Sequence, residues 1–250
     1  MSASSEALDE PENQKFSGPL QASNLLFNRY LYILKLLSIF MFNNEAYGRI
    51  KAEIPPNVKI LAATKTKPVE DIIEAINSGI NIIGENYVQE AEEKYEKLKI
   101  LFKEKNISLH LIGHLQSKKA RKAAEIFDCI ESIDSVKLTE KIDNACKELN
   151  KKIDIMIEIN FGETQKSGVL IPELDSLIEK IKIFQNINLI GLMCIPPIGK
   201  EEETFKKMKE FKEIYHLKEL SIGMSSDYKT AIAHDSTIIR LGTILFGERK

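Results

Sequence analysis

Residues 59–83 read KILAATKTKPVEDIIEAINSGINII, and this stretch decides the fold. A short apolar run, Lys59–Thr64, is followed by an amphipathic pattern from Pro68 and by a second apolar run, Ile80–Ile83. Pro68 suits a first helical turn, and Gly79 can cap the far end of the helix. A strand, a helix and a second strand in this order form a βαβ unit, whose strands run parallel.

The same alternation continues to the end of the chain. Helix candidates lie between further apolar runs, one opened by Pro172 and one spanning Glu201–Tyr215. About eight such units, with the last strand close to the C-terminus, favour a single closed (β/α)8 TIM barrel in the α/β class. An open doubly wound sheet is the alternative. The further runs are Leu109–Ile112, Cys129–Ile130, Ile153–Ile159, Leu189–Met193, Leu220–Ile222 and Thr237–Leu241.

Three regions are expected along the 250 residues. Residues 1–24 are rich in Ser, Glu, Pro and Gln and predict a disordered tail. Residues 25–56 predict an extra N-terminal apolar helix and a linker, and residues 57–250 predict the barrel. Arg29 and Lys35 argue against a membrane span in this helix, since each costs about 3 kcal/mol near a bilayer centre.

The apolar composition of Leu25–Phe42 leaves membrane association and a mitochondrial location open. The three cysteines have no CxxC spacing, which indicates reduced thiols and a cytoplasmic protein. A net charge of −2 gives no reason to expect nucleic acid as a partner. We expect a monomer.

Lys65 follows the first expected strand directly. Because side chains alternate along a strand, Leu61, Ala63 and Lys65 share one face. If Ala63 points into the barrel, Lys65 points into its mouth, at the carboxyl ends of the strands where barrel sites lie. A lysine desolvated there can lose its proton and form an imine. The alternative reading, from position alone, is that Lys65 extends into water.

The last two strands carry an anion-binding pattern. Barrels frequently bind phosphate through the loops after the seventh and eighth strands. Gly242 lets the backbone approach an anion, Thr243 adds a hydroxyl, and a helix starting after Gly242 would direct N–H groups at the anion. Ser225 would complete the cradle. Barrel closure places this cradle next to Lys65, which is the geometry that a pyridoxal 5′-phosphate (PLP) Schiff base needs.

Arg240 lies two residues before Gly242 and is therefore expected to face inward as well. A buried arginine needs an acceptor, which is either an interior carboxylate or the pyridine nitrogen of the cofactor. Arginine would leave that nitrogen unprotonated and weaken the ring as an electron sink.

These residues also belong to motifs that resemble, in order, those of the pyridoxal phosphate homeostasis protein family. The likeness extends from about Asn57 to the end of the chain. One departure is Asp235, where the family usually has Gly before Ser-Thr. The motifs include Lys65-Thr-Lys-Pro68, Ile83-Gly-Glu-Asn-Tyr-Val-Gln-Glu90, His110-Leu-Ile-Gly-His-Leu-Gln116, Gly223-Met-Ser-Ser-Asp227 and Ser236-Thr-Ile-Ile-Arg-Leu-Gly-Thr-Ile-Leu-Phe-Gly247.

The resemblance implies a barrel like the N-terminal domain of alanine racemase, with PLP on Lys65 rather than on Lys67. Asn86 also fits an N-cap, with Gln89 three residues later, and the two roles are compatible. Cofactor contacts are implied for the residues that match Asn86, Met224, Ser225, Arg240, Gly242 and Thr243.

Family members are regarded as carriers in vitamin B6 balance, without an established catalytic reaction. The resemblance therefore implies intracellular PLP homeostasis, client PLP apoenzymes as partners, and neither catalytic residues nor a metal. A racemase-like PLP enzyme and a PLP-independent phosphate-binding barrel enzyme are the alternatives. Alanine racemases add a C-terminal β-domain, which a chain ending at Lys250 is not expected to supply.

Overall fold

The computed structural model describes residues 42–162 and 167–248. All of these residues belong to one compact unit, Met41–Lys250. The predicted tail and apolar helix lie outside the described residues, apart from Phe42. Within the two described ranges, no helix is both long enough and apolar enough to cross a membrane.

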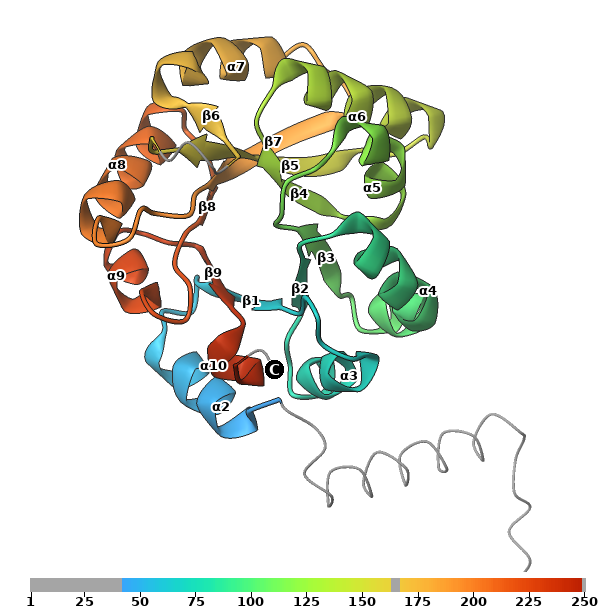
Figure 1. Ribbon diagram of the computed structural model, residues 1–250, viewed down its shortest axis with the longest axis vertical. Helices are drawn as coiled ribbons and strands as arrows, with labels where there is room; N and C mark the ends of the chain where they lie inside the picture. The colour runs from blue at the N-terminus through green and yellow to red at the C-terminus, as the bar shows by residue number, and fades with distance from the viewer. Residues whose placement is uncertain (1–41, 163–166, 249–250) are drawn as a thin grey trace, which may run out of the picture. The chain divides into compact units, whose positions relative to one another are not determined.

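A closed ring of eight parallel strands forms the centre of this unit (Figure 1). Each strand pairs with the next, β4 pairs with β5, and β9 returns to pair with β1, where Leu61 stands opposite Arg240. The predicted barrel is confirmed, and the open sheet is wrong. The strands are β1 (Lys59–Ala63), β2 (Ile82–Glu85), β3 (Ser108–Leu111), β4 (Cys129–Ile133), β5 (Ile153–Asn160), β7 (Ile187–Met193), β8 (Glu219–Ser221) and β9 (Ile238–Leu241).

Helices surround the ring (Figure 1). They are amphipathic, as α3 illustrates by burying Ile72, Ile73 and Ile76 against the strands. A short strand, β6 (Val169–Leu170), pairs with the end of β5 as a separate sheet. The helices are α2 (Asn44–Glu53), α3 (Val69–Asn77), α4 (Val88–Glu104), α5 (Ala120–Ile126), α6 (Val136–Glu148), α7 (Leu174–Ile181), α8 (Glu201–Ile214), α9 (Tyr228–Ala233) and α10 (Thr243–Phe246), with 3-10 turns η1 (Ser117–Lys119) and η2 (Ile171–Glu173).

Helix α3 begins and ends close to the proline and the glycine that the sequence places there. Pro68 occupies the N-cap, one position before the predicted first turn. Gly79 has a φ of +104°, which only glycine adopts readily, and it follows the C-cap Ser78. The chain therefore turns at Gly79 into β2.

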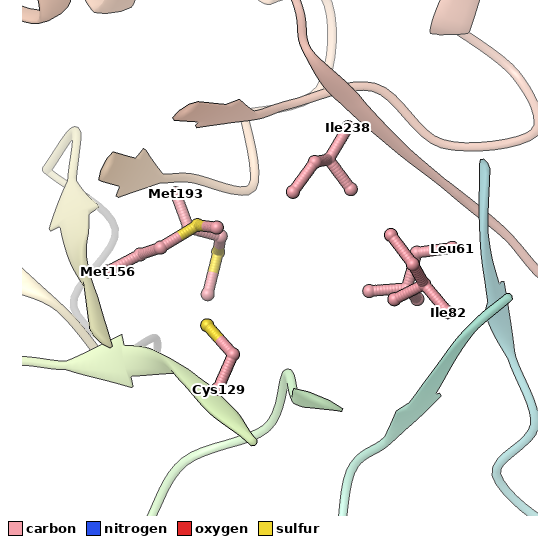
Figure 2. Close-up of a cluster of buried hydrophobic side chains, with 6 residues drawn as sticks. All are labelled: Leu61, Ile82, Cys129, Met156, Met193 and Ile238. Carbon is pink, nitrogen blue, oxygen red and sulfur yellow. The ribbon is translucent and has the colours of Figure 1, made fainter. Parts of the chain in front are cut away.

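Apolar side chains from six different strands fill the barrel interior (Figure 2). Ala63, Ile112 and Ile195 are partly buried and pack against this cluster. Because Ala63 follows Leu61 on the same face of β1, the predicted inward direction of this face is confirmed. The cluster consists of Leu61, Ile82, Cys129, Met156, Met193 and Ile238.

Helix α2 lies within the segment that was predicted as apolar helix and linker, and the sequence interpretation did not resolve it. Its N-cap residue, Asn43, donates from its backbone N–H to the carbonyl of Leu245 at 2.7 Å. The rings of Phe42 and Phe246 lie 5.5 Å apart. These contacts hold α2 against α10, the helix that starts after Gly242.

Asp235, the departure from the family pattern, has a φ of +59°. Glycine suits such a position, and Asp is one of the few other residues that tolerate it. The following Ser236 is buried, and its hydroxyl reaches the carbonyls of Ile222 and Ile238 at 2.8 and 3.1 Å. The substitution therefore keeps the backbone turn that joins α9 to β9.

Gly191→Ala is expected to destabilise the barrel by about 1–3 kcal/mol, the range for overpacking a closed interior. A Cβ at Gly191 would lie 2.3 Å from the backbone oxygen of Glu219, on the neighbouring strand β8. Gly48 in α2 is the matched control, because a Cβ there meets nothing within 4 Å. Gly48→Ala should stabilise by about 0.5–1 kcal/mol. Urea unfolding measures both, and equal midpoints for the two variants would contradict the assignment.

Candidate functional site

A cavity of about 500 Å³ opens at the carboxyl ends of the strands. The structure brings all seven residues singled out from the sequence to its wall: Lys65, Asn86, Met224, Ser225, Arg240, Gly242 and Thr243. A larger and more open hollow of about 900 Å³ lies around Asn106, Asp128 and Lys151, at the opposite, amino ends of the strands. Barrel sites lie at the carboxyl ends, so the smaller cavity is the candidate.

The floor of the cavity is apolar. Ala63, Ile112 and Ile195 line it and also pack against the interior cluster below. They separate the cavity from the barrel interior. The polar groups of the site therefore act from the rim and from the β8–β9 side.

Two lysines border the cavity just after β1, and their surroundings differ. Lys65 is half-buried at the end of the strand. The Nζ of Lys67 donates a hydrogen bond to the carbonyl of Phe246 at 2.8 Å and lies 5.9 Å from the centre of its ring. Lys67 is thus held by the last turn of α10.

The residues of the expected anion-binding pattern lie together at the β8–β9 side of the cavity. Gly242 precedes α10, which starts at Thr243, and Ser225 reaches across from the β8 side. The backbone N–H of Ile244 donates to the Ser225 hydroxyl at 3.3 Å. A Cβ at Gly242 would lie 3.6 Å from Ala63, so the absence of a side chain keeps this corner of the cavity open.

Asn86 lies in the turn after β2. Helix α4 begins at Val88 with Tyr87 at the N-cap, so the N-cap interpretation of Asn86 is wrong. Gly113 fixes its place instead: a Cβ there would lie 2.3 Å from the backbone oxygen of Asn86. Met224 is fixed by its backbone N–H, which donates to the Asp227 carboxylate at 2.5 Å.

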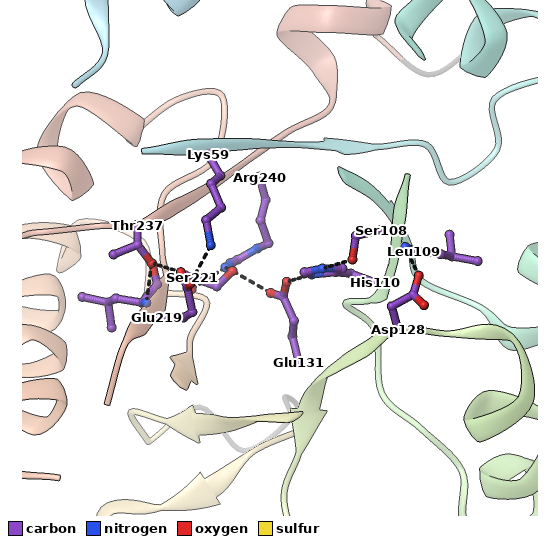
Figure 3. A network of polar contacts seen from close by, with 11 residues as sticks. Lys59, Ser108, Leu109, His110, Asp128, Glu131, Glu219, Ser221, Thr237 and Arg240 are labelled. Atoms are coloured by element: carbon purple, nitrogen blue, oxygen red, sulfur yellow. Dashed lines mark hydrogen bonds and ion pairs between the residues drawn. The ribbon is translucent and has the colours of Figure 1, made fainter. Parts of the chain in front are cut away.

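Arg240 is buried and held by a chain of polar groups that crosses the barrel (Figure 3). Its Nη1 donates to the carbonyl and the hydroxyl of Ser221 at 2.5 and 2.9 Å, and its Nη2 donates to the carbonyl of Cys194 at 2.8 Å. The Ser221 hydroxyl donates to Glu131 at 2.6 Å. The other oxygen of Glu131 accepts from Nδ1 of His110 at 2.7 Å.

The predicted alternatives for Arg240 are therefore compatible. Glu131 supplies an interior negative charge, and the Ser221 hydroxyl connects it to Arg240, accepting from the guanidinium and donating to the carboxylate. A guanidinium has five N–H groups, and the three bonds to protein groups leave others that can face the cavity. Burial alone would raise the pKa of the Glu131 carboxyl, but the hydrogen bond and charge of His110, the charge of Arg240 and the Ser221 hydroxyl together lower it.

The sequence interpretation did not identify Glu131 as a site residue, although its position in the sequence indicates that it faces inward. It follows Cys129 by two residues within a short apolar run and so shares the inward face of β4. A second missed carboxylate, Glu158 on β5, is buried and accepts a hydrogen bond from Ser167 at 2.8 Å. Burial raises the pKa of Glu158. In the described part of the chain, no three His, Cys, Asp or Glu side chains are grouped to hold a metal ion.

The chain matches the family of alanine racemase N-terminal domains over residues 44–250. It is 39% identical over 220 residues to a pyridoxal phosphate homeostasis protein of Synechocystis sp. (strain PCC 6803), covering 84% of this chain and 100% of the relative. A pyridoxal phosphate homeostasis protein of Escherichia coli K12 is 35% identical over 208 residues, covering 78% and 87%.

The chain belongs to the pyridoxal phosphate homeostasis protein family. Among solved structures, PipY of Synechococcus elongatus PCC7942 without PLP superposes with a TM-score of 0.77 at 35% identity, covering 82% of this chain and 99% of PipY. The structure of PipY with PLP bound gives 0.75 at 34% identity, with the same coverage. An alanine racemase of Clostridium difficile shares 16% identity at a TM-score of 0.66 and covers 82% of this chain and 58% of the racemase, which shows a common barrel fold alone.

Within this family site, Glu131→Gln should destabilise the barrel at pH 7 by about 3 kcal/mol, the lower end for breaking a buried charge pair. The substitution removes the carboxylate that accepts from Ser221 and His110, and with it one of two buried negative charges, Glu131 and Glu158, that interact with Arg240. Because the folded-state pKa of Glu131 is lowered, its stabilisation is present above the unfolded value of about 4.3 and is lost as the pH falls through the folded value. Urea unfolding at pH 7 and at pH 4 should show a smaller difference between variant and parent at pH 4. A difference that grows on acidification would contradict this assignment.

Proposed function

We propose that this chain binds PLP in the cavity at the carboxyl ends of the strands and carries it as a Schiff base on Lys65. Its role would be intracellular PLP homeostasis: holding the reactive cofactor and releasing it to client apoenzymes. Two findings support the proposal. Relatives at 35–39% identity are named pyridoxal phosphate homeostasis proteins, and PipY has been solved with PLP bound.

The observation that carries the proposal is the meeting of three kinds of group in one cavity. A lysine (Lys65), two hydroxyl residues (Ser225 and Thr243) and an arginine (Arg240) line the same cavity. A volume of about 500 Å³ suits a small cofactor, since ligand pockets measure roughly 300–1,000 Å³. The residues present therefore fit a molecule with an aldehyde, an aromatic ring and a phosphate.

The phosphate would lie at the β8–β9 corner. Ser225 and Thr243 supply hydroxyl donors there, and Gly242 leaves room for the anion against the backbone. The planar ring would lie over Ala63, Ile112 and Ile195, the apolar floor.

Lys65 is the lysine we assign to the covalent bond. Its amine would condense with the aldehyde of PLP to form the C=N bond, with loss of one water. The Nζ of Lys67 donates to the carbonyl of Phe246, in the last turn of α10. The buried cysteines Cys129, Cys146 and Cys194 form no disulfide, which supports a reducing compartment, and we propose the cytoplasm.

Arg240 determines what the bound cofactor can do. PLP enzymes use the ring as an electron sink, which a protonated pyridine nitrogen promotes. A guanidinium keeps its protons at working pH, so Arg240 can only donate toward that nitrogen, and its charge disfavours protonation nearby. Glu131, Ser221 and Cys194 hold Arg240 in place for this role. We propose that the chain is a carrier and not a catalyst of amino-acid chemistry.

Lys65→Ala should abolish the adduct that borohydride reduction traps after PLP is added, with the barrel still folded by circular dichroism. Lys67→Ala is the matched control and should keep the adduct, because Lys67 contacts Phe246 instead. Peptide mass spectrometry of the reduced protein locates the label. A label on Lys67 in the parent protein would refute the assignment, and protein that stays colourless after PLP addition would refute PLP binding itself.

The parent protein should exchange its imine with added amines yet turn over no amino acid. Absorbance near the imine band follows the exchange, and chiral chromatography with keto-acid assays follows racemisation and transamination. If the parent protein turns over an amino acid robustly and Lys65→Ala loses that activity, the carrier proposal is contradicted. Such a result would favour a racemase-like enzyme.

A further inference from the structure

A buried lysine lies beneath the end of β1. Lys94 of α4 is only 8% exposed, which is unusual for a lysine. Its Nζ donates to three oxygens, each at 2.7 Å: the carboxylates of Glu85 and Glu90 and the backbone carbonyl of Thr64. The hydroxyl of Thr64 also donates to Glu85, at 2.6 Å. We call Glu85, Glu90 and Lys94 the α4 cluster.

The cluster holds both peptide groups that flank Lys65. The carbonyl of Thr64 belongs to the peptide bond before Lys65, and it accepts from Lys94. The N–H of Thr66 belongs to the peptide bond after Lys65, and it donates to Glu90 at 2.5 Å. Because these two bonds fix the planes on either side of one residue, they fix the direction of the Lys65 Cα–Cβ bond.

The backbone needs such support at this point. Thr66 has a φ of +64°, a left-handed conformation that a β-branched residue rarely adopts. Strained residues persist where their surroundings over-determine them, and they gather at functional sites. The left-handed turn at Thr66 stands between Lys65 and Lys67, which both line the cavity, and Lys67 is held at the carbonyl of Phe246.

Stability alone is a poor reason for this arrangement. Oε2 of Glu85 is buried and lacks a hydrogen-bond partner among the described residues. Burial raises the pKa of Glu85, against the opposing charge of Lys94. A buried ion pair that is incompletely satisfied is often no more stable than apolar packing.

We propose that the α4 cluster is a positioning device for Lys65. Glu85 and Glu90 orient Lys94, and Lys94 and Glu90 fix the backbone on both sides of Lys65. This geometry aims Lys65, and not Lys67, at the aldehyde of PLP. The inference rests on the proposed function and adds a reason for the choice between the two lysines.

Lys94→Met tests the cluster in the full-length protein, with Lys99→Met as control. Lys99 lies on the same helix in an exposed pair with Glu96. We expect Lys94→Met to weaken PLP binding about tenfold, the loss for a lysine that no longer points at its target. The borohydride-trapped label should divide between the Lys65 and Lys67 peptides. Lys99→Met should match the parent in both measurements.

A pair of variants at the partly exposed Glu90 covers the case in which Lys94→Met fails to fold. Glu90→Gln keeps an oxygen for the Thr66 N–H and should retain more single-site labelling than Glu90→Ala, which removes that acceptor. A purely structural role would lower the melting temperature of these variants and leave all label on Lys65 with parental affinity, and that result overturns the inference. If the parent protein itself takes no label on Lys65, the proposed function fails instead.

Discussion

The pairing of the first and last strands is the contact on which the site depends. Leu61 on β1 stands opposite Arg240 on β9, and Ala62 stands opposite Leu241. Two residues beyond the Leu61–Arg240 pair, this register brings Ala63 beside Gly242. Lys65 and the hydroxyls of Ser225 and Thr243 thus share one cavity, although about 180 residues separate the first from the last. A slip of one residue would turn every inward side chain of β9 outward.

The barrel interior combines an apolar cluster with a polar chain, and the two have different uses. Leu61, Met156 and Met193 belong to the cluster that supports the cavity floor. The chain from His110 through Glu131 and Ser221 to Arg240 spans β3, β4, β8 and β9. Such a chain contributes little net stability, since desolvation offsets its electrostatic gain. Its effect is to fix the guanidinium of Arg240, because each hydrogen bond to it restricts the rotamers that the side chain can adopt.

Most of the fold and much of the cavity wall could be predicted from local patterns. All eight apolar runs became barrel strands, and the two-residue period identified Ala63 as inward. The N-cap interpretation of Asn86 failed because α4 begins one residue later, with Tyr87 at the N-cap, and the close approach of Gly113 to Asn86 is a contact that no local pattern encodes. Glu131, the charge partner of Arg240, lies across the barrel and more than a hundred residues away in the chain. Pairings of that kind become visible only when the strands are placed.

The two lysines of the Lys65-Thr-Lys-Pro68 motif show why a motif alone leaves a choice open. Both line the cavity, and both carry a primary amine at the end of the same side chain. Their difference comes from outside the motif. Lys67 is held by the carbonyl of Phe246, in a helix that α2 supports through Asn43 and Leu245. The backbone around Lys65 is held from α4. On the proposed assignment, the choice between the two lysines therefore depends on two helices that supply no atom to the covalent bond.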